Sequence, residues 1–241
     1  MELIPLVEET LFLKGFAERK WAEKQNLCHL TTLLIPTVRK DRDGSKLVQI
    51  QLRDRKKSFP CCRDVFGGHV TLNQEFWPFL LGRPFDLPKI VLAAAVREAN
   101  EELRVCSKGT GHPYIVTEKD LRQVGSTGEA RWNGKGNVER STIFLVPIRD
   151  NCVVHPMDDI EGIFVPVETE PVDWQVLRTY FLNNQQYAFE DREKAKEAGC
   201  EQNREKWQFA DGAARILKDE RLFKMVLAAI DALADDDFKP V

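Results

Sequence analysis

Residues 91–105 read VLAAAVREANEELRV, and this stretch decides the fold class expected for the chain. Its apolar residues recur every three or four positions, so a helix places them in one stripe: Leu92, Val96, Ala99 and Leu103. Proline is favoured in the first turn of a helix, and Pro88 therefore marks the expected start. The sequence predicts a helix from about residue 88 to 104 whose apolar stripe packs on a sheet.

The same helix carries three carboxylates, Glu98, Glu101 and Glu102. At positions i, i+3 and i+4 they share one patch, which we expect roughly opposite the apolar stripe. A divalent cation would turn their mutual repulsion into attraction, and Mg²⁺ prefers carboxylate oxygens. Arg97 lies four residues before Glu101 and is expected to hold that carboxylate in position. The pattern predicts a site for Mg²⁺ (or Mn²⁺), and the alternative is an ordinary solvated acidic face.

Strand patterns lie on both sides of this helix. Residues 29–38 (HLTTLLIPTV) are rich in β-branched side chains, residues 41–45 (DRDGS) form a turn signal, and residues 46–52 (KLVQIQL) alternate. Together they predict a hairpin. A short strand is expected within residues 60–68, and three further segments resemble strands: 121–125, 139–148 and 162–167.

The ends of the chain are expected to be helical. A short helix is predicted around residues 16–24, and residues 172–237 have a helical pattern with breaks near Asn183 and Gly199. Strands, a helix, more strands and then helices argue for a mixed α/β (α+β) fold with a helical C-terminal extension.

Sequence upstream of the acidic helix strengthens its interpretation. Residues 59–70 read FPCCRDVFGGHV, with the glycine pair Gly67 and Gly68, and REANEEL follows at 97–103. This resembles the Nudix family, whose signature is G-x5-E-x7-R-E-U-x-E-E-x-G-U, where U is a bulky apolar residue. The matching residues are Arg97, Glu98, Glu101, Glu102 and Val105, with Ala99 at the first apolar position.

The resemblance covers roughly residues 28–170. It implies a Nudix-type mixed sheet sandwiched between helices, with metal-binding glutamates that face a substrate diphosphate. Residues 1–27 would be an N-terminal arm and residues 171–241 a helical extension packed on the same domain.

The chain departs from the signature at three places. Its final glycine is Arg104 here, and its first glutamate falls on Lys89. The distance from Gly68 to Arg97 is also longer than in the signature, so residues 71–87 form an insertion that could supply Glu75 in place of the lost glutamate. Because the insertion is rich in aromatic side chains, we expect it to be buried against the C-terminal extension or a partner subunit; the alternative is a mobile lid over the pocket.

Other residues are similar to the branch of the superfamily that includes isopentenyl-diphosphate isomerase. His29 opens the first long strand, His69 follows the glycine pair, and Glu139 stands where the isomerases carry an acidic metal ligand. The isomerase cysteine is Gly67 here, and a second acidic ligand would be Ser141, so the chain resembles the hydrolase members of that branch. Gly67, Gly68, His69 and His29 are expected to contact substrate; the alternative for the two histidines is a structural role.

The resemblance implies hydrolysis of a phosphoanhydride in a nucleoside diphosphate linked to another group. Catalysis is expected from Glu98, Glu101, Glu102 and Arg97, with Glu139 as a further metal ligand. Basic residues near 53–57 are expected at the distal phosphate. One rival interpretation is a Nudix-fold module that binds a nucleotide or a protein without turnover, and a weaker one is an isomerase-like enzyme.

Composition and charge limit the classes of binding partner that we expect for the chain. Charged residues make up 30% of the 241 residues and the net charge is −3, so no nucleic-acid partner is expected. No apolar run reaches the length of a membrane span. The six cysteines include no C-x-x-C pair, and we expect neither structural zinc nor a disulfide framework. The chain is predicted to be cytoplasmic, and the sequence leaves open whether it forms a homodimer.

Overall fold

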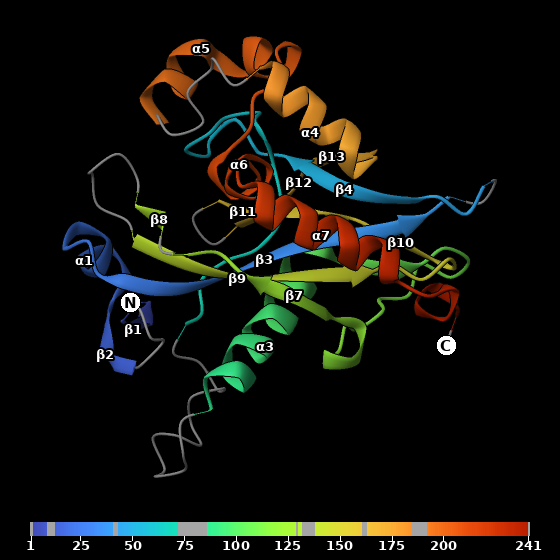
Figure 1. Cartoon of the computed structure of the whole chain (residues 1–241), viewed down its shortest axis with the longest axis horizontal. Coiled ribbons are helices and arrows are strands. Elements are labelled where there is room, and N and C mark those ends of the chain that lie inside the picture. Colours follow the sequence, from blue (N-terminus) through green and yellow to red (C-terminus); the bar gives the residue numbers. More distant parts are fainter. Residues whose placement is uncertain are drawn as a thin grey trace.

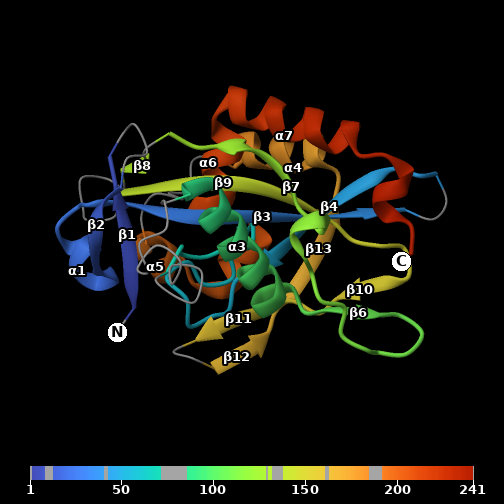
Figure 2. The ribbon, with the colours of Figure 1, turned by 90° about the horizontal axis from the view of Figure 1, so that it is seen from below.

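The computed structural model describes residues 2–8, 13–40, 43–71, 86–128, 130–131, 138–160, 163–184 and 192–240. Within them a nine-stranded sheet with parallel and antiparallel pairs runs through the molecule. Helix α3 lies on one face, and helices α4, α6 and α7 lie on the other (Figures 1 and 2). The mixed α/β architecture expected from the sequence is confirmed.

Two long parallel strands form the centre of the sheet, β3 (Cys28–Arg39) and β9 (Val138–Pro147). Strand β4 (Lys46–Leu52) pairs antiparallel with β3, which confirms the predicted hairpin. The other strands extend the sheet: β13 (Glu168–Val172) and β5 (Arg63–Asp64) on β4, β7 (Arg122–Ser126) and β8 (Ala130–Arg131) on β9, and β1 (Leu3–Val7) with β2 (Leu13–Glu18) beyond β3. Two separate two-stranded antiparallel sheets pair β6 (Val105–Ser107) with β10 (Cys152–Val154), and β11 (Met157–Ile160) with β12 (Ile163–Pro166).

The central strands are buried on both faces and supply two cores. Leu33 and Ile35 of β3 pack with one cluster, whereas Leu30 and Leu34 pack with the other. This division follows from the period of two residues along a strand. Because β3 has buried apolar side chains on both faces, helices pack on each side of the sheet, as predicted.

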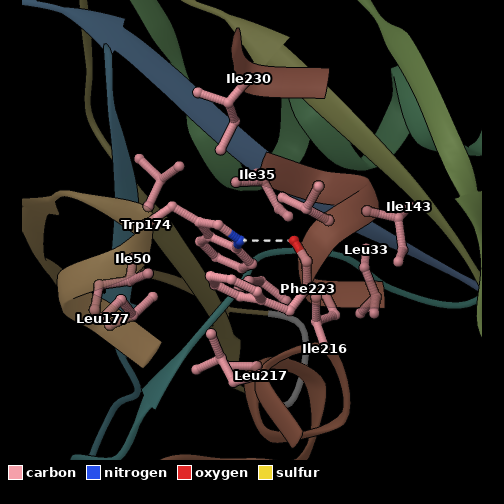
Figure 3. Packing of buried hydrophobic residues seen from close by; sticks show 14 of the residues in the cluster. Leu33, Ile35, Ile50, Ile143, Trp174, Leu177, Ile216, Leu217, Phe223 and Ile230 are labelled. Atoms are coloured by element: carbon pink, nitrogen blue, oxygen red, sulfur yellow. Dashed lines mark hydrogen bonds between the residues drawn. The ribbon is translucent and has the colours of Figure 1, made fainter. Parts of the chain in front are cut away.

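The larger core joins the sheet to the C-terminal helices α4 (Trp174–Asn183), α6 (Asp211–Lys218) and α7 (Glu220–Ala232). Trp174 is fully buried there, stacks on Phe223 with ring centroids 5.9 Å apart, and donates from Nε1 to the Phe223 carbonyl at 3.3 Å (Figure 3). A buried indole N–H needs such a partner. The C-terminal helices thus form the layer on this face of the sheet and share its core.

Helix α3 (Leu87–Glu98) continues as a π-helical turn, Ala99–Leu103, so the predicted helix is present but changes pitch near its end. The predicted stripe is only partly correct. Ala99 and Leu103 are fully buried, but Leu92 and Val96 are half-buried at the rim of the core. The buried face is centred on other residues instead: Ile90, Val91, Ala94 and Ala95. The helix is rotated toward the acidic side because the glycine segment packs against it there.

The ends of the chain differ from expectation in one detail. The N-terminal helix α1 covers only Arg19–Lys24, because residues 13–18 pair as β2 with β1. In the tail, α4 ends at Asn183 and the helical stretch α5 (Arg192–Glu205) is interrupted at Gly199, so both predicted breaks are confirmed.

One disulfide joins Cys61, in the loop before β5, to Cys200 of α5. A disulfide framework was not expected from the sequence, and this bridge was not predicted. Disulfides are nevertheless uncommon in reducing compartments, so the cytoplasmic location stays a prediction. Within the described ranges, none of the helices has the length and apolar character needed to cross a bilayer.

Candidate active site

A polar cavity of about 400 Å³ opens between β3, the glycine segment, α3, α6 and α1. It collects most of the residues that the sequence singled out, although they come from separate parts of the chain. The predicted site residues that line it are Gly67, Gly68, His69, Arg97, Glu98, Glu101, Glu102 and Glu139. The remaining one, His29, is fully buried beside it, with its ring stacked on His69.

The glycine segment runs antiparallel to β3 at the wall of the cavity. Thr32 N–H donates to the Gly68 carbonyl at 2.8 Å, and Val70 N–H donates to Leu30 at 3.0 Å. Gly67 has φ +136, and a Cβ there would lie 2.0 Å from the Thr32 carbonyl oxygen. No other residue type fits at that distance from a backbone atom.

Gly68 makes the second close approach, toward α3. A Cβ at this position would lie 2.5 Å from Cδ of Glu98. The Glu98 carboxylate therefore occupies the space that a side chain at position 68 would need. Glu102 contacts the same segment, since its Oε2 accepts the Gly67 N–H at 2.8 Å.

The three glutamates differ in exposure. Glu98 is 8% exposed, whereas Glu101 and Glu102 are half-buried. The structure thus corrects the expectation of a patch opposite the core, because the first carboxylate is buried beneath the glycine segment. Glu101 and Glu102 belong to the π-helical turn, whose i→i+5 spacing differs from that of the preceding α-helix.

Arg97 lies among these carboxylates. Its Nη1 is 2.8 Å from Oε1 of Glu98 and 2.9 Å from Oε2 of Glu101, while Nη2 donates to the His69 carbonyl at 2.9 Å. One guanidinium therefore orients two carboxylates and ties them to the glycine segment. A planar group with several fixed donors suits this task better than a flexible ammonium.

Burial decides the electrostatics of Glu98. Loss of water raises the pKa of Glu98 to about 7, against the attraction of Arg97. A bound dication would favour the ionised form. The donor set is all oxygen and includes two more carboxylates that line the same cavity, so the donor chemistry of Glu98, Glu101 and Glu102 suits Mg²⁺ or Mn²⁺, and their binding of a metal stays a prediction.

Comparison with known proteins gives a weak likeness to Nudix proteins of known structure. No protein-family model and no curated protein matches the chain. The structure is similar to that of DR0079 from Deinococcus radiodurans, with 18% identity over 76% of this chain and 90% of that one and a TM-score of 0.43. It is also similar to a NUDIX hydrolase from Alicyclobacillus acidocaldarius, with 13% identity over 65% of this chain and 83% of that one and a TM-score of 0.43. An Ap4A hydrolase from C. elegans matches with 11% identity over 85% of this chain and 98% of that one and a TM-score of 0.39. Similarity this low identifies no family.

The cavity lining also contains cationic residues paired with acids. Arg53 donates to Asp64 at 2.6 Å, and Arg215 contacts Glu139 at 3.1 Å. Lys57 also lines the cavity. The loop 53–57 thus reaches the site as the sequence analysis suggested, although its contact with a phosphate stays a prediction.

Several lining residues were not found from the sequence. Arg19 and Glu23 come from α1, and Asp211 and Arg215 from α6. No motif marks them, because the arm and the C-terminal helices reach the site only through tertiary packing. Their one local signal is the spacing of Asp211 and Arg215, which places both on one helical face.

Arg104 lies at the position of the signature glycine. It has φ 44 and ψ 65, a left-handed conformation in which glycine carries no strain.

Residues 72–85, which include Glu75 and most of the predicted insertion, lie outside the described residues. The burial of the insertion and the role of Glu75 in metal binding therefore stay predictions.

Proposed function

We propose that this chain is a Nudix-type hydrolase that cleaves a phosphoanhydride in a nucleoside diphosphate linked to another group. The observation that carries the proposal is the convergence of Glu98, Glu101 and Glu102 on one polar cavity beside the Gly67–Gly68 segment. The proposal includes Mg²⁺ or Mn²⁺ as the cofactor held by these three carboxylates.

The bound dication would supply charge neutralisation on the phosphate oxygens and a more acidic water. The chain's own residues have three tasks. Arg97 orients the carboxylates of Glu98 and Glu101 through the contacts at 2.8 and 2.9 Å. Glu101 or Glu102, the two more accessible carboxylates, accepts the proton of the attacking water. Arg53 and Lys57 attract the distal phosphate.

Hydrolysis then adds one water across the phosphoanhydride. The water oxygen bonds to one of the two phosphorus atoms, and the bond from that phosphorus to the bridging oxygen breaks. The other phosphate leaves with the bridging oxygen. The cavity volume of about 400 Å³ lies at the small end of ordinary ligand sites, which suits a diphosphate with part of its substituents.

The test is a coupled phosphate-release screen over nucleoside diphosphate derivatives with MgCl₂. We expect turnover of at least one compound, with a loss of about 100-fold or more in Glu101→Gln and in Glu102→Gln. The matched control is Glu118→Gln, which changes an exposed carboxylate remote from the cavity lining. Nucleotide binding without any product would contradict hydrolysis and support the rival interpretation, a binding module.

A further inference from the structure

The loop between β4 and β5, residues 53–62, connects the active-site cavity to the periphery of the fold. Its first half supplies Arg53 and Lys57 to the cavity lining. Its second half contains Cys61, which forms a disulfide with Cys200 of α5, 139 positions away in the chain. The loop therefore carries both cations proposed to attract the distal phosphate and one end of a covalent bridge.

Helix α5 lies at the outer edge of the molecule and has few buried side chains (Figure 1). Among its described residues, those that are buried are Ala195 and Asn203. Asn203 Nδ2 donates to the Pro60 carbonyl of the loop at 2.8 Å. A small apolar cluster adds further contact between helix and loop: Phe59, Cys62, Ala195 and Ala210. Because so small a cluster buries little apolar surface, the disulfide is a major part of what holds α5 against the loop.

The backbone at the bridge depends on its surroundings. Cys61 has φ 54, in the left-handed region that is unfavourable for residues other than glycine. Such a conformation persists where neighbouring contacts fix it. Here these contacts include the disulfide and the hydrogen bond from the Cys61 N–H to the Arg53 carbonyl at 3.0 Å. When the disulfide opens, one of these constraints is lost and the backbone is freer to leave the left-handed region.

The chemistry of the neighbouring thiol favours this pairing of cysteines. Cys61 and Cys200 are both half-buried, so the bridge is not sealed in a core and a small thiol reductant can reach it. Cys62, next in the chain, is buried, and burial raises the pKa of its thiol to about 12. Since the thiolate is the form that attacks a disulfide, Cys62 does not compete for either partner. The bridge therefore opens and closes between the same two sulfur atoms.

We propose that the Cys61–Cys200 disulfide is a redox-sensitive device that orders the loop 53–62 at the cavity and so regulates ligand binding there. The inference rests on the proposed function for the identity of the ligand, a nucleoside diphosphate. A dithiol reductant gives two electrons and two protons to the bridge: the S–S bond breaks, two thiols form, and the reductant becomes a cyclic disulfide. A small-molecule disulfide reverses the step. In the cytoplasmic compartment predicted from the sequence, such bridges are usually transient or redox-sensing.

The reduced loop should bind phosphate less tightly, because its cations must be ordered when the ligand binds. For one long side chain such as Lys57, the cost of this ordering corresponds to a ~2–10-fold loss of affinity. Arg53 keeps its contact with Asp64 at 2.6 Å, which does not depend on the bridge. We therefore expect reduction to weaken the site and not to abolish it.

The first test follows the loop itself by limited proteolysis with trypsin. Residues 53–57 read RDRKK, so the loop contains several tryptic sites. The full chain is reduced with dithiothreitol, alkylated with iodoacetamide and desalted. Cleavage within the loop is then compared by mass spectrometry with cleavage after Lys108, which lies in an exposed turn. We expect reduction to raise the rate of loop cleavage severalfold relative to cleavage after Lys108, because cleavage follows the population of the opened loop.

The second test measures binding of ADP with MgCl₂ by calorimetry in the two redox states. We expect a dissociation constant that is ~2–10-fold higher after reduction. Cys200→Ser should resemble the reduced chain from the start and show no response to the treatment. Cys106→Ser changes a half-buried cysteine outside the bridge and is the matched control, which should respond like the unaltered chain.

Unchanged loop cleavage after reduction would overturn the proposal, and so would an unchanged ADP affinity in a chain whose loop is cleaved faster. An equal response of Cys200→Ser and the unaltered chain would also overturn it, because another cysteine would then be responsible. If ADP binds in neither redox state, the nucleotide part of the proposed function fails. The cleavage ratio alone then decides whether the bridge orders the loop.

Discussion

The substitution Gly68→Ala tests whether the glycine segment exists to make room for a metal-binding carboxylate. The new Cβ would lie 2.5 Å from Cδ and Oε2 of Glu98, whereas ordinary contact begins near 3.4 Å. The carboxylate must therefore move by about 0.9 Å or adopt another rotamer. Crowding of this kind typically costs about 1–3 kcal/mol of unfolding free energy.

The same displacement should also weaken metal binding. Displacement of a catalytic group by about 1 Å can cost ~100-fold in rate, and we expect at least a tenfold loss of Mn²⁺ affinity. Mn²⁺ binding is measured by calorimetry, and unfolding by urea with circular dichroism. Gly109→Ala is the control, since its Cβ would meet nothing within 4 Å.

Gly67→Ala provides the contrast. Its Cβ would lie 2.0 Å from a backbone oxygen of β3 at φ +136, and neither the strand nor the dihedral can adjust cheaply. We expect this variant to be severely destabilised, whereas Gly68→Ala should remain folded. Unchanged Mn²⁺ affinity in Gly68→Ala would refute the reasoning, as would equal destabilisation of the two alanine variants.

Three further predictions concern stability. Arg104→Gly should be more stable than Arg104→Ala by about 1 kcal/mol in urea titrations, because only glycine avoids left-handed strain; equal stability would contradict this. Burial raises the pKa of Asp64 to about 6 from 3.8, so the folded state binds its proton more tightly. Asp64 should consequently lower the unfolding free energy by at most about 3 kcal/mol as the pH rises from about 4 to 6. Asp64→Asn should remove this share of the fall and leave the share of Glu98, whose pKa is also raised; an unchanged pH profile would exclude Asp64 as a cause. Cys200→Ser should lower the unfolding free energy by about 2–4 kcal/mol without reductant and have little effect with dithiothreitol, and equal effects in both conditions would show that the disulfide is not the cause.

Local pattern was enough to predict the elements that surround the site. The hairpin of β3 and β4 follows from alternation and a turn signal, and α3 follows from its 3.6-residue period. The spacing of Arg97 and Glu101 likewise predicts their contact, because helical geometry makes residues four apart neighbours. These features depend on residues close in the chain.

Packing direction could not be predicted in the same way. Apolar spacing placed the buried face of α3 at Leu92 and Val96, yet the helix is turned so that Glu98 is buried. The reason is the pair of glycines more than twenty-five residues upstream, which lets α3 approach β3 at that point. Helical periodicity specifies that a helix has a buried side, but its neighbours decide where that side is centred.

The mixed α/β class and the helix that carries three carboxylates follow from short-range spacing and side-chain chemistry alone. What those carboxylates face depends on the tertiary structure. It brought Glu23 from the arm, Glu139 from β9 and Arg215 from α6 to one cavity. These contacts join residues far apart in the chain, and no local period encodes which of them meet.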